Sequence, residues 1–128
     1  MRKFSVFAIV LGSFLVLNSG AGWAAENDAA SAARGLKIFQ SICSHCHTTT
    51  HEASSVKAPG LKGVLDRHNA AWINQWLTSP EAFSKKDETA KKLIDSHPYK
   101  LVMPTFPEMQ NAGNRADVIE YLKTLKDD

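Results

Sequence analysis

The stretch Cys43-Ser44-His45-Cys46-His47 contains both cysteines of this 128-residue chain. Two thiols one helical turn apart can form thioethers with the two vinyl groups on one edge of a porphyrin. A histidine directly after them is carried under the ring, where an imidazole nitrogen can bind iron. This CxxCH pattern is the attachment signature of a c-type haem. It predicts one covalent haem c, attached through Cys43 and Cys46, with His47 as an iron ligand.

Three other uses of the cysteine pair compete with haem attachment. A thioredoxin-like redox pair would follow a β-strand, whereas the preceding residues have helical spacing. A zinc site could join the pair to His47 and one further histidine, but no second CxxC or HxxxH pair supports it. A disulfide across two intervening residues would be strained and would stabilise little.

The N-terminus has the pattern of an export signal. A basic start at Arg2 and Lys3 precedes an apolar run over residues 4–17, and mostly small residues follow up to Ala24. The run is shorter than the roughly 20 residues of a spanning helix, although an uncleaved membrane anchor is the alternative. We therefore expect a signal peptide over residues 1–24, a domain over residues 25–128 and a periplasmic location, with no membrane span after cleavage.

Composition fits one ordinary globular domain, with 44% hydrophobic and 22% charged residues. The formal net charge of +2 comes from the export signal, because removing Arg2 and Lys3 leaves equal numbers of acidic and basic side chains. A neutral domain of this kind argues against nucleic-acid binding.

The chain from about Gly35 to Leu125 resembles the class I monohaem c-type cytochromes of bacteria. The resemblance is carried by the CxxCH motif and by further matching positions: Gly35, Phe39, Pro59, Leu61, Gly63, Arg67, Met103-Pro104-Thr105-Phe106 and Tyr121-Leu122. It implies an all-α, small cytochrome c fold, with about four helices and long loops wrapped around one covalent haem. It also implies that the first helix packs against the last through Gly35 and Phe39.

A second iron ligand has several candidates. Met103 precedes Pro104, which stiffens the backbone where a ligand must be held, so Met103 is the main candidate. Met109 is better explained by packing in the core. His97 is the strongest rival, and an open position is the remaining possibility.

By the same resemblance, three other residues would support the cofactor. The carbonyl of Pro59 would accept the second ring N–H of His47. Arg67 would point to a haem propionate, with a surface ion pair to Asp66 or Glu52 as its alternative. The Trp76 indole would donate to a propionate, unless it only packs in the core.

Capping residues and apolar spacing predict four helices. The first begins near Asp28 or Ser31 and reaches the motif, and a mostly irregular stretch from Thr48 to His68 follows. The second helix covers residues 70–78 and is capped by Asn69. The third starts at Ser84 with Asp87, ends before Pro98 and buries Ala90, Leu93 and Ile94. The last starts at Asn114 with Asp117 and buries Val118, Tyr121, Leu122 and Leu125.

The function implied by the resemblance is electron transfer without catalysis. Its partners would be redox proteins that donate and accept electrons, with a periplasmic dehydrogenase or a terminal oxidase among them. The protein would be a monomer or would bind these partners in transient complexes. Lysines at positions 85, 86, 91 and 92 could steer an acidic partner or form a solvated face. The alternatives are a haem c subunit of a periplasmic dehydrogenase, and a haem enzyme or gas-binding protein with a weak sixth ligand.

Overall fold

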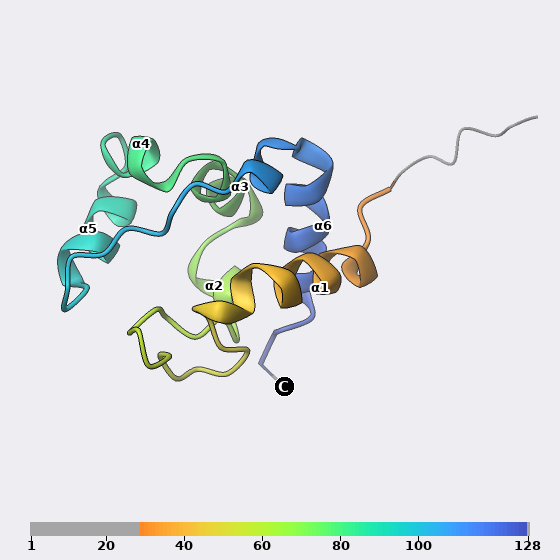
Figure 1. Cartoon of the computed structure of the whole chain (residues 1–128), viewed down its shortest axis with the longest axis horizontal. Coiled ribbons are helices and arrows are strands. Elements are labelled where there is room, and N and C mark those ends of the chain that lie inside the picture. The colour runs from red at the N-terminus through yellow and green to blue at the C-terminus, as the bar shows by residue number, and fades with distance from the viewer. Residues whose placement is uncertain (1–28, 128) are drawn as a thin grey trace, which may run out of the picture.

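The computed structural model describes residues 29–127, and this part of the chain contains helices and loops but no β-strand (Figure 1). The all-α prediction is confirmed. The elements in chain order are α1 (Ala32–Ser41), η1 (Cys43–His45), α2 (Val64–Arg67), α3 (Ala70–Thr78), α4 (Pro80–Ser84), α5 (Glu88–Ser96), η2 (Pro107–Gln110) and α6 (Ala112–Lys123). The short helices α2 and α4 raise the number of α-helices above the four expected.

The predicted signal peptide lies outside the described residues. Within residues 29–127, no helix combines the length and the apolar character that crossing a membrane requires.

Helix α1 packs directly against α6, as Figure 1 shows. Ser31 caps α1 by accepting a hydrogen bond from the Arg34 amide. Gly35 is required at the crossing, because a Cβ atom there would lie 1.9 Å from the carbonyl oxygen of Asp117. Phe39 lies one turn further on, with its ring centroid 5.1 Å from that of Tyr121. The predicted packing of the first helix on the last is confirmed.

A buried carboxylate also joins the two helices. Asp117 is only 4% exposed, and it accepts hydrogen bonds from the Ser31 amide and from Nε and Nη2 of Arg34, at 2.6, 2.7 and 2.8 Å. These bonds to Arg34 and Ser31 hold the pKa of Asp117 below its usual range, although burial opposes the shift. The side chain therefore contributes to tertiary structure rather than to helix capping.

The predicted start of the last helix at Asn114 is wrong. Helix α6 begins at Ala112, and its N-cap is Asn111, whose side chain accepts from the amides of Gly113 and Asn114 at 2.8 and 3.1 Å. Asp117 cannot complete a capping box because its carboxylate faces α1. The predicted apolar face is present: Val118 and Leu122 are buried, and Tyr121 and Leu125 pack against the core.

Helix α3 has the predicted bounds, and the Asn69 side chain accepts from the Trp72 amide at 2.9 Å. The prediction that Ser84 starts the next helix is wrong, because Ser84 is the last residue of α4. Pro80 begins α4, where its fixed φ suits the first turn. Asp87 is the actual N-cap of α5 and accepts from the Ala90 amide at 2.8 Å.

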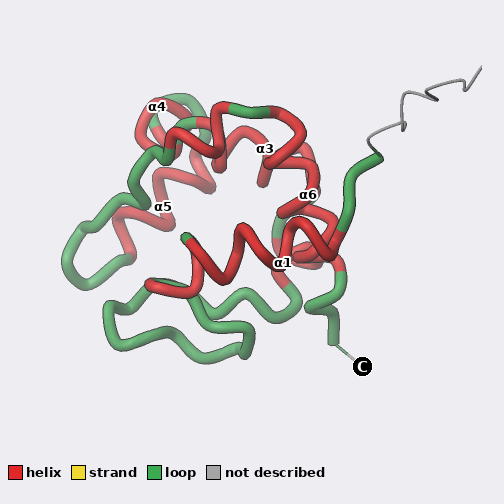
Figure 2. Tube along the Cα trace, turned by 45° about the vertical axis from the view of Figure 1, so that its right-hand side comes forward, coloured by secondary structure: helices red, strands yellow, loops and turns green. Residues whose placement is uncertain are grey.

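The stretch from Thr48 to His68 is mostly irregular, as expected, and its one short helix is α2, which follows Gly63 with its positive φ of 65°. One further expectation for this region is wrong. On α5, only Ala90 is fully buried, while Leu93 is 37% exposed. In Figure 2 the long loop after α1 runs along the side of the molecule opposite α3 and α4.

Candidate functional site

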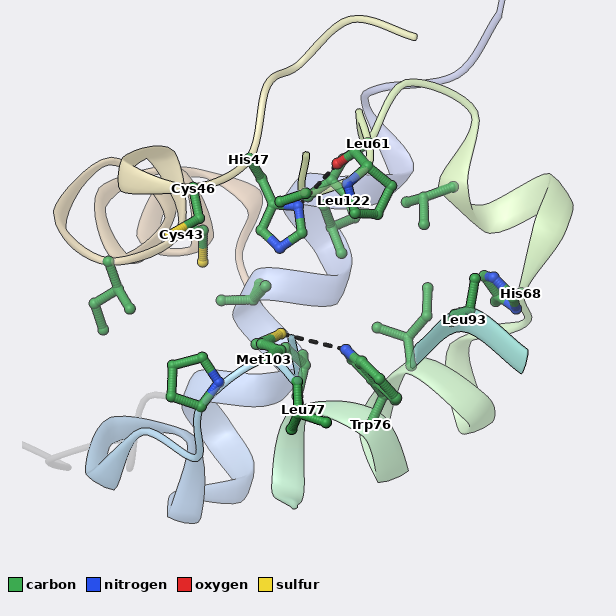
Figure 3. A pocket seen from close by; sticks show the side chains of 18 of the residues that line it. Cys43, Cys46, His47, Leu61, His68, Trp76, Leu77, Leu93, Met103 and Leu122 are labelled. Atoms are coloured by element: carbon green, nitrogen blue, oxygen red, sulfur yellow. Dashed lines mark hydrogen bonds between the residues drawn. The ribbon is translucent and has the colours of Figure 1, made fainter. Parts of the chain in front are cut away.

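A cavity of about 370 Å³ lies between the helices and two long loops, one between η1 and α2 and the other between α5 and η2. Its volume falls in the usual range for a ligand site. The lining is mostly apolar and comes from α1, η1, α2, α3, α5, α6 and both loops. Its chemically distinctive members are Cys43, Cys46, His47, Trp76, His97 and Met103. Residues far apart in the sequence therefore meet around one apolar space (Figure 3).

Both cysteines lie at one side of this cavity, on the tight turn of η1 (Figure 3). The turn is closed by hydrogen bonds from the amides of Cys46 and His47 to the Cys43 carbonyl, at 3.1 and 2.9 Å. Cys43 is half-buried and Cys46 exposed, and both are free thiols. Burial raises the pKa of the Cys43 thiol to about 11. The turn therefore presents two neighbouring thiols to one edge of the cavity.

The competing uses of the pair find no support in the structure. The segment before the motif is helix α1 rather than the strand that a thioredoxin-like site requires. Within residues 29–127, no three His, Cys, Asp or Glu side chains are arranged to hold a metal ion. The two sulfurs are not joined in a disulfide.

His47 is held by the loop that follows it. Its Nδ1 lies 2.8 Å from the Pro59 carbonyl oxygen, so Nδ1–H donates and Nε2 is left as the electron-pair donor. The predicted hydrogen bond between these residues is therefore present. Burial lowers the pKa of His47, although the bond to Pro59 opposes the shift. The result is a neutral imidazole whose Nε2 points into the cavity (Figure 3), the form that a metal ion binds.

Met103 lies on the other side of the cavity from His47 (Figure 3). Its sulfur accepts a hydrogen bond from the Trp76 indole, with an Nε1–Sδ distance of 3.2 Å. This partner was not expected for Trp76, for which a propionate or simple packing was predicted. The sequence contains no signal for it, because the two residues belong to separate segments.

The two rivals of Met103 have other contacts. Met109 is 1% exposed and lies in the hydrophobic core, as the packing interpretation predicted, and it does not line the cavity. His97 lines the cavity, but both its ring nitrogens are engaged. Nδ1 lies 3.1 and 3.3 Å from the amide nitrogens of Tyr99 and Leu101, and Nε2 lies 3.3 Å from the Val56 carbonyl oxygen.

Arg67 does not line the cavity in this structure. Its guanidinium donates to the carbonyl oxygens of Lys62 and Gly60, both at 2.8 Å. The alternative ion pair is absent too, because no salt bridge within residues 29–127 joins Arg67 to Asp66 or Glu52. The guanidinium instead braces the loop that carries Pro59.

Sequence reasoning missed a second indole in the cavity wall. Trp72 stacks on Trp76 with ring centroids 5.5 Å apart, and its Nε1–H donates to Asp87 at 3.0 Å. His68 also stacks on Trp72, with ring centroids 4.0 Å apart. The spacing of Trp72 and Trp76 was a usable signal, since residues four apart share one helix face.

The four lysines predicted as a possible docking face differ in their contacts. Lys85, at the C-cap of α4, pairs with Glu81 at 2.9 Å, and Lys91 pairs with Asp95 within α5. Lys86 and Lys92 are exposed. Half of this group is therefore partly neutralised by neighbouring carboxylates.

The donor set fits a haem c. The cavity wall is apolar, two thiols lie at one edge, and an imidazole nitrogen and a thioether sulfur lie on opposite sides. Nitrogen and thioether donors on two faces of a porphyrin are one of the known axial pairs of haem iron.

Comparison with known proteins agrees with this chemistry. The family model described as Cytochrome c matches residues 32–126. Cytochrome c2 of Rhodopila globiformis is 35% identical over 100 residues, which cover 72% of this chain and 91% of that protein. Cytochrome c of Guizotia abyssinica is 33% identical over 104 residues, with 77% and 94% covered.

Among solved structures, the cytochrome c domain of the pp3183 protein from Pseudomonas putida matches with a TM-score of 0.59. That match has 29% identity and covers 70% of this chain and 85% of the other. The chain therefore belongs to the cytochrome c family of electron-transfer proteins, which bind one haem c covalently and are not enzymes.

Proposed function

We propose that this protein is a periplasmic electron carrier in which His47 and Met103 are the two axial ligands of the haem iron. The observation that carries the proposal is their placement on opposite sides of an apolar cavity whose edge holds both cysteines. With both axial positions filled by the protein, no position remains for a substrate. Exchange of single electrons is then the chemistry available at the site.

The surrounding residues have distinct tasks in this proposal. Pro59 fixes the orientation of the His47 ring through the 2.8 Å hydrogen bond and increases the basicity of Nε2. Trp76 orients Met103 through its sulfur. The apolar lining excludes water, which limits reorganisation between oxidation states. When bound, the haem supplies the ferric–ferrous couple, whose potential thioether ligation raises.

Electrons would enter and leave where the site meets the surface. Cys46 is exposed, so the haem edge bonded to its sulfur would lie closest to a docked partner. A donor and an acceptor of the redox-protein class would bind there in turn. Such encounters are brief and involve small interfaces.

The ligand assignment is tested by the near-infrared spectrum of the ferric protein. We expect a sulfur-to-iron charge-transfer band in the wild type and its loss in Met103→Ala. The matched control is Met109→Leu, which alters the other described methionine with little change of volume and should retain the band. A band that persists in Met103→Ala would overturn the assignment.

Location and mode of action need separate measurements. If the signal peptide is cleaved after Ala24, the mass of the purified native protein will correspond to residues 25–128 plus one haem. A mass that includes residues 1–24 would favour an uncleaved anchor. Stable co-purification with a dehydrogenase would identify an enzyme subunit instead of a free carrier, and rapid carbon monoxide binding to the reduced protein would indicate an open iron position.

A further inference from the structure

The segment that carries Met103, residues 97–106, has few hydrogen bonds of its own. It is the long connection from α5 toward α6 in Figure 1. Its one internal backbone bond among the described residues is the turn from the Lys100 amide to the His97 carbonyl, at 3.0 Å. From Leu101 to Thr105, no described backbone amide bonds to another backbone carbonyl. The position of Met103 must therefore be fixed by other contacts.

The His97 side chain supplies such contacts. Its Nδ1 accepts from the amides of Tyr99 and Leu101, so Nδ1 carries no proton. In the neutral ring Nε2 then carries the proton and donates to the Val56 carbonyl at 3.3 Å. Val56 belongs to the other long loop, 41 residues away in sequence. One imidazole thus organises the Met103 segment and ties it to the loop that follows the haem motif.

The backbone on both sides of this contact is unusual. Lys100, between the two amides that His97 binds, has a φ of 53°, and Lys57, next to Val56, has a φ of 64°. Lysine is disfavoured in this left-handed region, and such residues persist where surrounding contacts over-determine them. The two strained positions adjoin the His97 hydrogen bonds, which help to hold both loops in these conformations.

We propose that His97 is a positioning residue that holds the Met103 segment against the Val56 loop and so keeps the sulfur in place as the sixth ligand. This inference rests on the proposed ligation by Met103. Without the imidazole, the segment would swing away from the cavity more often. An external ligand could then reach the sixth position more easily.

The experiment is a titration of the ferric holoprotein with imidazole, followed by loss of the near-infrared band. We expect His97→Ala to reach half-conversion at about tenfold less imidazole than the wild type. A factor of ten corresponds to about 1.4 kcal/mol of opening free energy. His97→Asn places an amide oxygen where Nδ1 accepts, so it should lie between the alanine variant and the wild type.

The matched control is His51→Ala. His51 lies in the same long loop as Val56, but it pairs with Asp127 at 2.7 Å and does not line the cavity. Its loss should leave the imidazole midpoint unchanged. An unchanged midpoint in His97→Ala would overturn the proposal, as would an equal shift in His51→Ala. If His97→Asn reached half-conversion at the same low imidazole concentration as His97→Ala, the accepting role of Nδ1 would be wrong.

Failure of this inference is distinguishable from failure of the ligand assignment. If Met103→Ala lacks the near-infrared band while His97→Ala behaves like the wild type, the ligation stands and the role of His97 is wrong. If Met103→Ala keeps the band, the ligation is wrong and the inference falls with it.

Discussion

Trp76 offers a direct test of how one hydrogen bond tunes the site. The indole N–H donates to the Met103 sulfur, and if that sulfur binds the iron as proposed, it would donate less electron density to the metal. Weaker donation from sulfur would destabilise the ferric state more than the ferrous state. The hydrogen bond from Trp76 should therefore raise the reduction potential. We expect Trp76→Phe to lower the potential by about 30 mV, which corresponds to about 0.7 kcal/mol for one electron. Potentiometric titration of the purified holoprotein measures the shift.

Trp72→Phe is the matched control for that measurement. It removes an indole from the same cavity wall, but this N–H donates to Asp87 at 3.0 Å and not to sulfur. Its shift should be clearly smaller. Equal shifts in the two variants would attribute the effect to the loss of an indole in general, and would contradict a specific role for the bond to Met103.

The buried carboxylate of Asp117 should make the unfolding free energy of the protein depend on pH. Because Arg34 holds its pKa below the usual range, the carboxylate stabilises the fold above its unfolded-state pKa, near pH 4. This contribution is lost as the pH falls through the lower folded-state pKa. Asp117→Asn should therefore lose about 2 kcal/mol of unfolding free energy at pH 6. The difference from the wild type should shrink below pH 4.

Denaturant unfolding followed by circular dichroism, at several pH values, gives the unfolding free energies of the wild type and of Asp117→Asn. Glu120→Gln is the control on the same helix, since Glu120 forms only a surface pair with Lys123 at 2.6 Å. Such pairs contribute at most about 1 kcal/mol. A difference between Asp117→Asn and the wild type that did not depend on pH would exclude the ionised carboxylate as its source.

At the scale of elements, the crossing of α1 and α6 depends on the missing side chain of Gly35. An added Cβ would lie 1.9 Å from the Asp117 carbonyl oxygen and 2.9 Å from the Tyr121 Cβ. Backbone atoms cannot rotate away, so the two helices would have to separate. We expect Gly35→Ala to lower the unfolding free energy by about 3 kcal/mol, measured by denaturant unfolding of the holoprotein.

Gly113→Ala is the matched control in α6. Its Cβ would meet only the Asn111 side-chain oxygen, at 3.1 Å, and alanine has the better helix propensity. The net change should stay below about 1 kcal/mol. If both variants lost the same stability, close helix contact would not explain the glycine at position 35.

The helices could be predicted where local chemistry determines them. Asn69 and Ser31 act as N-caps because an oxygen side chain before an apolar face satisfies the first free amides. Two helix starts predicted in the same way, at Ser84 and Asn114, are wrong. Near each of them lies another polar residue that could act as the N-cap equally well. The choice between such residues depends on tertiary contacts, such as the pairing of Asp117 with Arg34.

The site was predictable to the extent that its signal is local. The CxxCH motif and the Met103-Pro104 pair lie in short segments, so their meaning can be read without the fold. The partners of Trp76, Arg67 and His97 could not be predicted. Each depends on the exact path of a loop, and a loop's path is determined by bonds between segments far apart in the sequence.

At the scale of the whole molecule, the haem site and the hydrophobic core share residues. Phe39, Ile73, Leu77, Val118 and Leu122 belong to the buried core and also line the cavity. A domain of about 100 residues buries only a modest core. The apolar faces around the cavity can therefore contribute a large share of the domain's stability, but only when the haem covers them. The cofactor is therefore part of the folded structure as well as the redox centre.

Preventing haem attachment should therefore unfold most of the chain. We expect the double variant Cys43→Ala, Cys46→Ala to lose most of its helical circular dichroism signal, because α3 and α5 line the cavity with apolar side chains that would be uncovered without the haem. Met103→Ala, which keeps the covalent haem, is the control and should retain its helices. In the double variant, the amides most protected from hydrogen exchange should lie in α1 and α6, which Gly35 and the Arg34–Asp117 pair join outside the cavity. Uniform native-like protection would contradict a structural role for the haem.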